Sequence, residues 1–179
     1  MNLKEYQEKA ASTSLATQIP NSPFVDMALN LMSYSGKAIG KIKKLFRDKQ
    51  GKIDDGCCQD IQKNLAWAEG TCAGLHGLLE IKRIDDNING NSEVAYPVFG
   101  LYNEAGEVAE KINEQLNGTK VSDEEFKKIM SGELGDVLWY VAETCTRLGI
   151  SLDDVATANI QKLLDRKERG VIKGSGDNR

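Results

Sequence analysis

Apolar residues recur every three to four positions along nearly the whole chain, and this spacing restricts its fold more than any other feature. Such a period places the apolar side chains on one face of a helix, and no segment alternates as a half-buried strand does. We therefore predict an all-α bundle without strands. The expected helices cover about residues 3–16, 22–46, 58–81, 94–116, 122–148 and 151–170.

Cap residues support these boundaries. Asn2 is followed by Glu5, and Ser122 by Glu125, which is the spacing of a capping box. Ser22 precedes a proline that suits the first position of a helix, and Gly149 is suited to end one. We expect residues 85–92 to form a loop and the glycine-rich end of the chain to be irregular.

Charge and hydropathy exclude several classes of protein. Lys and Arg number 23 against 27 Asp and Glu, so a net charge of −4 disfavours a protein that coats nucleic acid. The longest apolar run, Val137–Ala142, is far shorter than the roughly 20 residues of a membrane span. The first residues lack the apolar core of a signal peptide, so we expect a cytoplasmic protein.

Four cysteines and the single histidine, His76, do not have the spacing of a zinc site or a disulfide framework. We expect the cysteines to be reduced thiols that mostly fill the core.

Two segments resemble each other. Residues 28–45 match 98–115 after a shift of 70, and residues 60–79 match 133–152 after a shift of 73. The segment 22–81 is therefore interpreted as a degenerate copy of a later helix pair. The alternative is coincidence, because two amphipathic helices always share part of their pattern.

Carboxylates form the most informative pattern. Glu104, Glu107 and Glu110 follow one another at intervals of three, and Glu133 is followed three residues later by Asp136. Residues three apart lie on neighbouring turns of one helix face. Apolar neighbours surround Glu133, so its charge needs a cation or a hydrogen-bond partner. Glu110 is expected to face solvent.

Two helices that each offer a carboxylate pair across a seam would create a site for a hard divalent cation, Mg²⁺ or Mn²⁺. Gly106 and Gly135 lie inside the two pairs, and we expect the helices to approach closely there. The alternative is a solvated face on which Glu107 pairs with Lys111.

At these residues the chain resembles the MazG-type all-α nucleoside triphosphate pyrophosphohydrolases. The resemblance is carried by Tyr6-Gln7, by Gly100–Lys111, by Glu133–Tyr140 and by Asn159–Gly170. It covers residues 1–13 and about 96–179, whereas 14–95 depart from the family, whose members usually have a short connection here. We expect one domain, 1–179, with an insert at 22–81, catalytic helices at 94–170 and a tail at 171–179.

The resemblance implies a Mg²⁺-dependent enzyme that converts an NTP or dNTP to the monophosphate and pyrophosphate, with Mn²⁺ as a substitute. It implies metal ligation by Glu104, Glu107, Glu133 and Asp136, and a homo-oligomer, most simply a dimer. Lys162 and Arg166 are expected to bind phosphates and Asn159 to contact sugar or base. The alternatives are a related enzyme acting on phosphoribosyl-ATP and an inactive nucleotide-binding or regulatory module.

Overall fold

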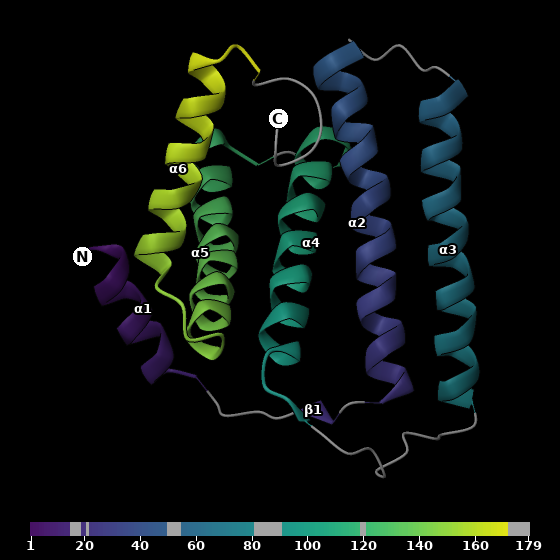
Figure 1. Ribbon diagram of the computed structural model, residues 1–179, viewed down its shortest axis with the longest axis horizontal. Coiled ribbons are helices and arrows are strands. Elements are labelled where there is room, and N and C mark those ends of the chain that lie inside the picture. The colour runs from purple at the N-terminus through teal and green to yellow at the C-terminus, as the bar shows by residue number, and fades with distance from the viewer. Residues whose placement is uncertain (15–18, 21, 50–54, 81–90, 119–120, 172–179) are drawn as a thin grey trace. The chain divides into compact units, whose positions relative to one another are not determined.

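The computed structural model describes residues 1–14, 19–20, 22–49, 55–80, 91–118 and 121–171, and the all-α prediction is confirmed. Two two-residue strands, β1 (Ile19–Pro20) and β2 (Asn91–Ser92), pair with each other. The sequence did not predict them, because a pairing this short needs no alternating pattern. The helices in chain order are α1 (Leu3–Ser12), α2 (Pro23–Lys49), α3 (Asp55–Glu80), α4 (Ala95–Asn117), α5 (Asp123–Arg147) and α6 (Leu152–Glu168) (Figure 1).

The helix ends follow the predicted caps. Asn2 and Glu5 form a complete capping box, and the side chain of Ser122 accepts a hydrogen bond from the backbone N–H of Glu125. Gly149 adopts a φ of 66°, which a side chain would disfavour. At this turn the N–H of Ile150 donates to the carbonyl of Cys145, which is the hydrogen bond of a Schellman motif. Gly149 therefore ends α5 and turns the chain toward α6.

The described residues form two compact units. The first contains α1, α4, α5 and the beginning of α6, through Ala158. Within it α4 packs against α5, and α1 packs against α5 (Figure 1). Its core combines one small or apolar side chain from α1, two from α5 and one from α6, namely Ala10, Ala142, Cys145 and Leu152.

The second unit contains α2 and α3, which pack as a helical hairpin, and the residues of α6 from Asn159 on. The rings of Tyr34 and Trp67 stack with their centroids 5.6 Å apart. Lys41 forms an ion pair with Asp60 nearer the end of α2. The helical insert predicted at 22–81 is thus a pair of long helices, while its place within a single domain stays a prediction.

The pseudo-repeat is not confirmed. In the pair of helices α4 and α5, Gly100 lies directly against Tyr140. Shifts of 70 and 73 relate these two residues to Asn30 and Trp67. Trp67 instead stacks on Tyr34, four residues or about one turn further along α2. The aromatic contact between α2 and α3 therefore lies about one helical turn away from the position that the proposed alignment with α4 and α5 requires.

Two further expectations concern segments outside the described residues: the loop is described only at 91–92, and the end of the chain only to 171. Among the helices described, none is both long enough and apolar enough to cross a membrane.

Candidate metal and nucleotide site

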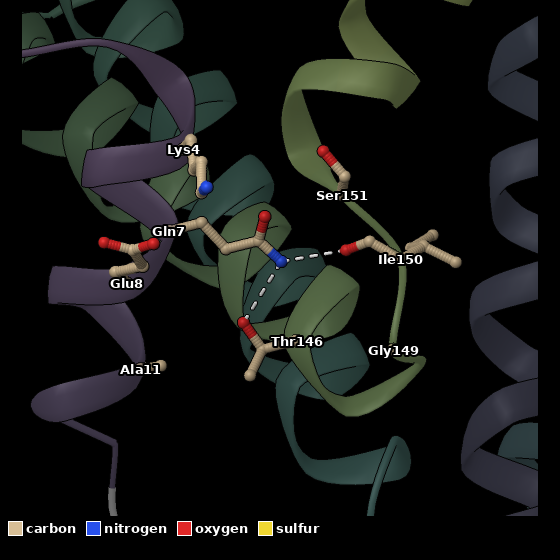
Figure 2. A pocket seen from close by; sticks show the side chains of 8 residues that line it. All are labelled: Lys4, Gln7, Glu8, Ala11, Thr146, Gly149, Ile150 and Ser151. Atoms are coloured by element: carbon tan, nitrogen blue, oxygen red, sulfur yellow. Dashed lines mark hydrogen bonds between the residues drawn. The ribbon is translucent and has the colours of Figure 1, made fainter.

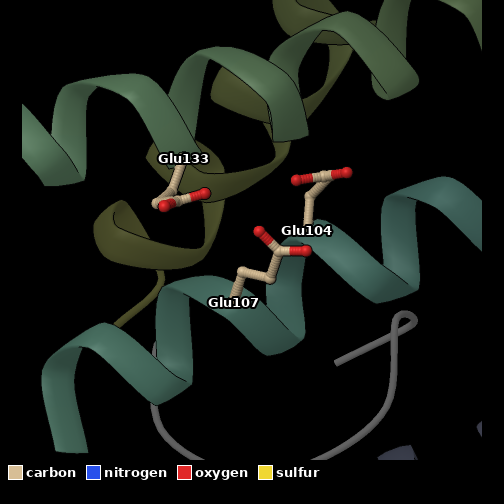
Figure 3. Close-up of side chains that lie close together, drawn as sticks. All are labelled: Glu104, Glu107 and Glu133. Atoms are coloured by element: carbon tan, nitrogen blue, oxygen red, sulfur yellow. The ribbon is translucent and has the colours of Figure 1, made fainter. Parts of the chain in front are cut away.

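Three of the predicted ligands converge across the seam between α4 and α5. Glu104 and Glu107 lie on neighbouring turns of α4, and Glu133 faces them from α5 (Figure 3). Each residue offers one carboxylate oxygen, and these oxygens all lie within 4.8 Å of one another. All three residues are partly buried, whereas Glu110 is exposed, as expected. Helical spacing accounts for Glu104 and Glu107 sharing one face of α4, and packing brings Glu133 against them.

The structure does not support the alternative in which Glu107 pairs with Lys111 on a solvated face. Lys111 instead forms an ion pair with Glu114, at 3.1 Å. Glu107 accepts a hydrogen bond from the side-chain amide of Asn103, at 2.8 Å.

Electrostatics set Glu104 apart within the cluster. Burial raises the pKa of its carboxyl group above the usual range, and the charges of Glu107, Asp136 and Glu133 raise it further. The hydrogen bond from Asn103 acts in the opposite direction. A carboxyl group with a raised pKa holds its proton more readily, so the metal-free protein keeps Glu104 protonated to a higher pH than an ordinary glutamate.

Asp136 lies close enough to affect the pKa of Glu104, but it is not one of the three carboxylates that converge. The residue is exposed, and its charge contributes to the raised pKa values of Glu104, Tyr6 and Tyr140. Its side chain is one methylene shorter than that of glutamate and so reaches less far across the seam. Its part as a fourth ligand stays a prediction.

A tyrosine pair borders the carboxylates, and the sequence did not predict it. Burial raises the pKa of Tyr140, with hydrogen bonding to Tyr96 and the nearby charge of Glu104 adding to the effect. The rings of Tyr96 and Tyr140 are 6.4 Å apart. A Cβ atom at Gly100 would lie 2.0 Å from Cε1 of Tyr140, so glycine at this position admits the ring against α4.

The close approach predicted at Gly106 and Gly135 is wrong, because no atom lies within 4 Å of a Cβ built on either glycine. Gly106 follows Glu104 by two residues, and Gly135 follows Glu133 by two residues. At about 100° per residue, each glycine therefore lies on the side of its helix away from the seam that the glutamate faces. Gly100, four residues before Glu104, is the glycine at the seam.

Helix α1 is fixed to this unit by side-chain hydrogen bonds. The amide of Gln7 donates to the carbonyl of Ile150 at 2.9 Å and accepts from the N–H of Leu152 at 2.8 Å. Figure 2 shows Gln7 reaching from α1 to Ile150 and Thr146 across a shallow pocket. None of the carboxylates of the cluster lines this pocket. Gln7 therefore positions α1 and the turn before α6.

The side chain of Trp139 packs within the chain. Its indole N–H donates to Oγ1 of Thr13 at 2.9 Å, and its ring packs on the core.

The three predicted substrate-binding residues, Asn159, Lys162 and Arg166, lie on α6 within the second unit. Asn159 and Lys162 are exposed, whereas Arg166 is 5% exposed. The neighbouring Arg169 forms an ion pair with Asp165, at 2.6 Å. Contacts of Asn159, Lys162 and Arg166 with a nucleotide stay a prediction.

The donor set at the seam fits a hard divalent cation. Carboxylate oxygens are the ligands that Mg²⁺ and Mn²⁺ prefer, and no histidine or cysteine belongs to the group of Glu104, Glu107 and Glu133. Three carboxylates this close repel one another unless a cation or protons compensate them.

Comparison with known proteins agrees with this geometry. The family model described as the MazG nucleotide pyrophosphohydrolase domain matches residues 98–171, which include every predicted site residue. The chain belongs to this family, whose members are generally metal-dependent, and is a pyrophosphohydrolase-type hydrolase in general terms.

A similar protein is the gene 37 protein of Mycobacterium phage L5. It is 44% identical over 95 residues, which cover 52% of this chain and 81% of the phage protein. No solved structure matches the chain significantly. Helices α2 and α3 lie outside the matched family region.

Proposed function

We propose that this protein hydrolyses a nucleoside or deoxynucleoside triphosphate between the α- and β-phosphoryl groups, giving the monophosphate and pyrophosphate. The observation that carries the proposal is the convergence of Glu104, Glu107 and Glu133 within 4.8 Å across two helices. A triphosphate is itself a ligand for the cation that such a cluster attracts, because phosphate oxygens are hard donors.

Glu104, Glu107 and Glu133 would hold Mg²⁺, with Asp136 as a fourth carboxylate beside them. When bound, Mg²⁺ polarises the phosphate oxygens and lowers the pKa of water. Glu104 is assigned as the proton acceptor for the attacking water, because its partly buried carboxylate lies within the cluster that would hold the cation. The oxygen of water bonds to the phosphorus of one product, and the bond between that phosphorus and the bridging oxygen breaks. The bridging oxygen leaves with the other product, and the proton lost by water passes to Glu104. The remaining contribution of the protein is positioning and charge compensation.

Lys162 and Arg166 are proposed to bind phosphates, and Asn159 to contact the sugar or base. The two cations are four residues apart on α6 and so lie on neighbouring turns. Lys162 is exposed, whereas the side chain of Arg166 is 5% exposed and would have to turn outward to reach a phosphate.

We also propose that the protein is a homodimer. Helices α4 and α5 leave large apolar side chains exposed, namely Ile112, Leu116, Leu134 and Leu138. Exposed large apolar side chains favour association with a partner that covers them. Light scattering coupled to gel filtration measures the mass directly, and a monomer at micromolar concentration would contradict this part of the proposal.

One experiment tests the reaction. The eight common NTPs and dNTPs, together with phosphoribosyl-ATP, are incubated with protein and Mg²⁺, and pyrophosphate and inorganic phosphate are measured separately. Pyrophosphate released with the matching monophosphate supports the proposal. Release of inorganic phosphate alone would contradict α–β cleavage, and turnover of phosphoribosyl-ATP alone would favour the related enzyme. No turnover of any substrate would favour an inactive binding module.

A further inference from the structure

Asn103 precedes Glu104 on α4 and lies one helical turn before Glu107. Its Nδ2 atom donates a hydrogen bond to Oε1 of Glu107 at 2.8 Å and lies 3.5 Å from Oε1 of Glu104. Ionised carboxylates only accept hydrogen bonds, so the amide nitrogen rather than the amide oxygen must face them. A single neutral donor is therefore shared by two negatively charged groups.

We infer that Asn103 is a positioning residue of the metal site, which holds the carboxylates of Glu104 and Glu107 together before a cation arrives. The inference rests on the metal site of the proposed function. Two adjacent carboxylates repel each other and would rotate apart toward solvent. The amide opposes this rotation because it is a donor fixed to the same helix. It engages one oxygen of Glu107 and leaves the second oxygen for the cation.

Hydrogen bonds of this kind orient the ligands of metal sites, and their loss typically lowers metal affinity by about 10- to 100-fold. Asn103 contributes no ligand oxygen in this geometry, since its nitrogen faces the carboxylates. Its effect should therefore be on the affinity for the cation and not on the chemistry once the cation is bound.

A purely structural role predicts a different outcome. Asn103 is exposed, and asparagine is a poorer helix former than alanine. Replacing it with alanine in the metal-free protein should leave the stability of α4 unchanged or raised. A loss of metal affinity without a loss of stability would therefore separate positioning from folding.

The same helix contains a matched control. Asn113 also lies exposed on α4 and makes a side-chain hydrogen bond four residues along, in which it accepts from Nδ2 of Asn117 at 2.9 Å. None of the carboxylates in the cluster is its partner in this contact. The substitution Asn113→Ala removes a comparable hydrogen bond from the same helix and leaves the metal site intact.

The experiment measures Mn²⁺ binding to the substrate-free protein by electron paramagnetic resonance, for the wild type, Asn103→Ala and Asn113→Ala. Thermal unfolding in EDTA is measured alongside. We expect Asn103→Ala to bind Mn²⁺ at least about tenfold more weakly, with an unchanged or higher Tm in EDTA. Asn113→Ala should bind as the wild type does. In turnover, more Mg²⁺ should restore the kcat of Asn103→Ala, while the Mg²⁺ concentration for half-maximal rate increases.

Each alternative outcome is decisive. Wild-type affinity in Asn103→Ala, within about twofold, would overturn the role of Asn103 and leave the metal site standing. An equal loss in both variants would also overturn it, because the effect would then belong to the helix. Absence of Mn²⁺ binding by the wild type would overturn the metal site and the inference together.

Discussion

The ring of Tyr140 occupies the space beside Gly100 that any side chain there would need, since a Cβ atom would lie 2.0 Å from Cε1 of the ring. The ring has entered the seam between α4 and α5 within one turn of Glu104. The packing of the hairpin and the shape of the site thus depend on the same glycine.

Gly100→Ala should displace Tyr140 and reduce activity. A contact of 2.0 Å requires the ring to rotate or the helices to separate, and shifts of about 1 Å near a reacting group can cost on the order of 100-fold in rate. We expect kcat to fall at least about tenfold and the Tm to decrease. Steady-state kinetics and thermal unfolding measure both quantities.

Gly106→Ala is the matched control on the same helix. No atom lies within 4 Å of a Cβ atom there, so alanine should stabilise α4 by roughly 0.5–1 kcal/mol. If Gly100→Ala raises the stability as Gly106→Ala should, the position of the Tyr140 ring does not depend on Gly100.

Glu133→Gln should abolish pyrophosphate release while the fold is kept. Glutamine preserves the shape of the side chain but removes the charge that faces Glu104 and Glu107 from α5. The metal-free Tm should stay level or rise, because mutual repulsion within the cluster is reduced. Glu110→Gln, on the exposed side of α4, is the control. A kcat above about a tenth of the wild-type value would contradict the metal assignment, since the activation free energy would then have risen by less than ~1.4 kcal/mol.

Mg²⁺ should raise the Tm in a concentration-dependent manner. A ligand at 100 times its Kd that binds only the native state adds about 2.7 kcal/mol to the free energy of unfolding. Mn²⁺ should substitute at least in part, EDTA should reverse the effect, and a chelator selective for zinc should do nothing. Unchanged stability and activity at millimolar Mg²⁺ would contradict the proposed metal site.

The pH dependence of stability should change sign with the metal. The pKa of Glu104 is raised in the folded protein, chiefly by burial, so the native state binds this proton more tightly than the unfolded state. In EDTA, this group should therefore lower stability as the pH rises from the ordinary glutamate value through the raised one. With Mg²⁺, which needs the ionised carboxylate, stability should rise over the same range. Tm measurements against pH, with Glu104→Gln as the comparison, test this; equal slopes in EDTA would contradict it.

A buried ion pair on α5 should contribute strongly to the stability of the unit that contains α1 and α5. Glu143 is 1% exposed, and its Oε1 accepts hydrogen bonds from Nε of Arg147 at 2.7 Å and from Oγ of Ser14 at 2.5 Å. Glu143→Ala leaves a largely buried guanidinium without its carboxylate and should cost about 3–5 kcal/mol in urea unfolding. Glu124→Ala, which breaks the exposed pair with Lys127, should change stability little. Similar costs for both variants would be inconsistent with this assignment.

The sequence alone predicted the helices, their caps and the glutamates that share a face. These features depend on residues three to five positions apart, and local rules cover that range. Asn2 with Glu5, Ser122 with Glu125 and Gly149 at the end of α5 are of this kind. Glu104 and Glu107 were placed together for the same reason, since residues three apart lie on one face of a helix.

Only the tertiary structure decided which residues of different helices oppose one another. The helical period gives the direction of a side chain about its own axis, but sliding one helix along its partner leaves that period unchanged. The sequence therefore selected Gly106 and Gly135 for the close approach, whereas packing selected Gly100 beneath Tyr140. Because helices can slide along each other in this way, Trp67 stacks on Tyr34, about one turn from the residue that the repeat alignment pairs with it. The register of a helix pair is set by the sum of many side-chain contacts, and no single spacing in the sequence records that sum.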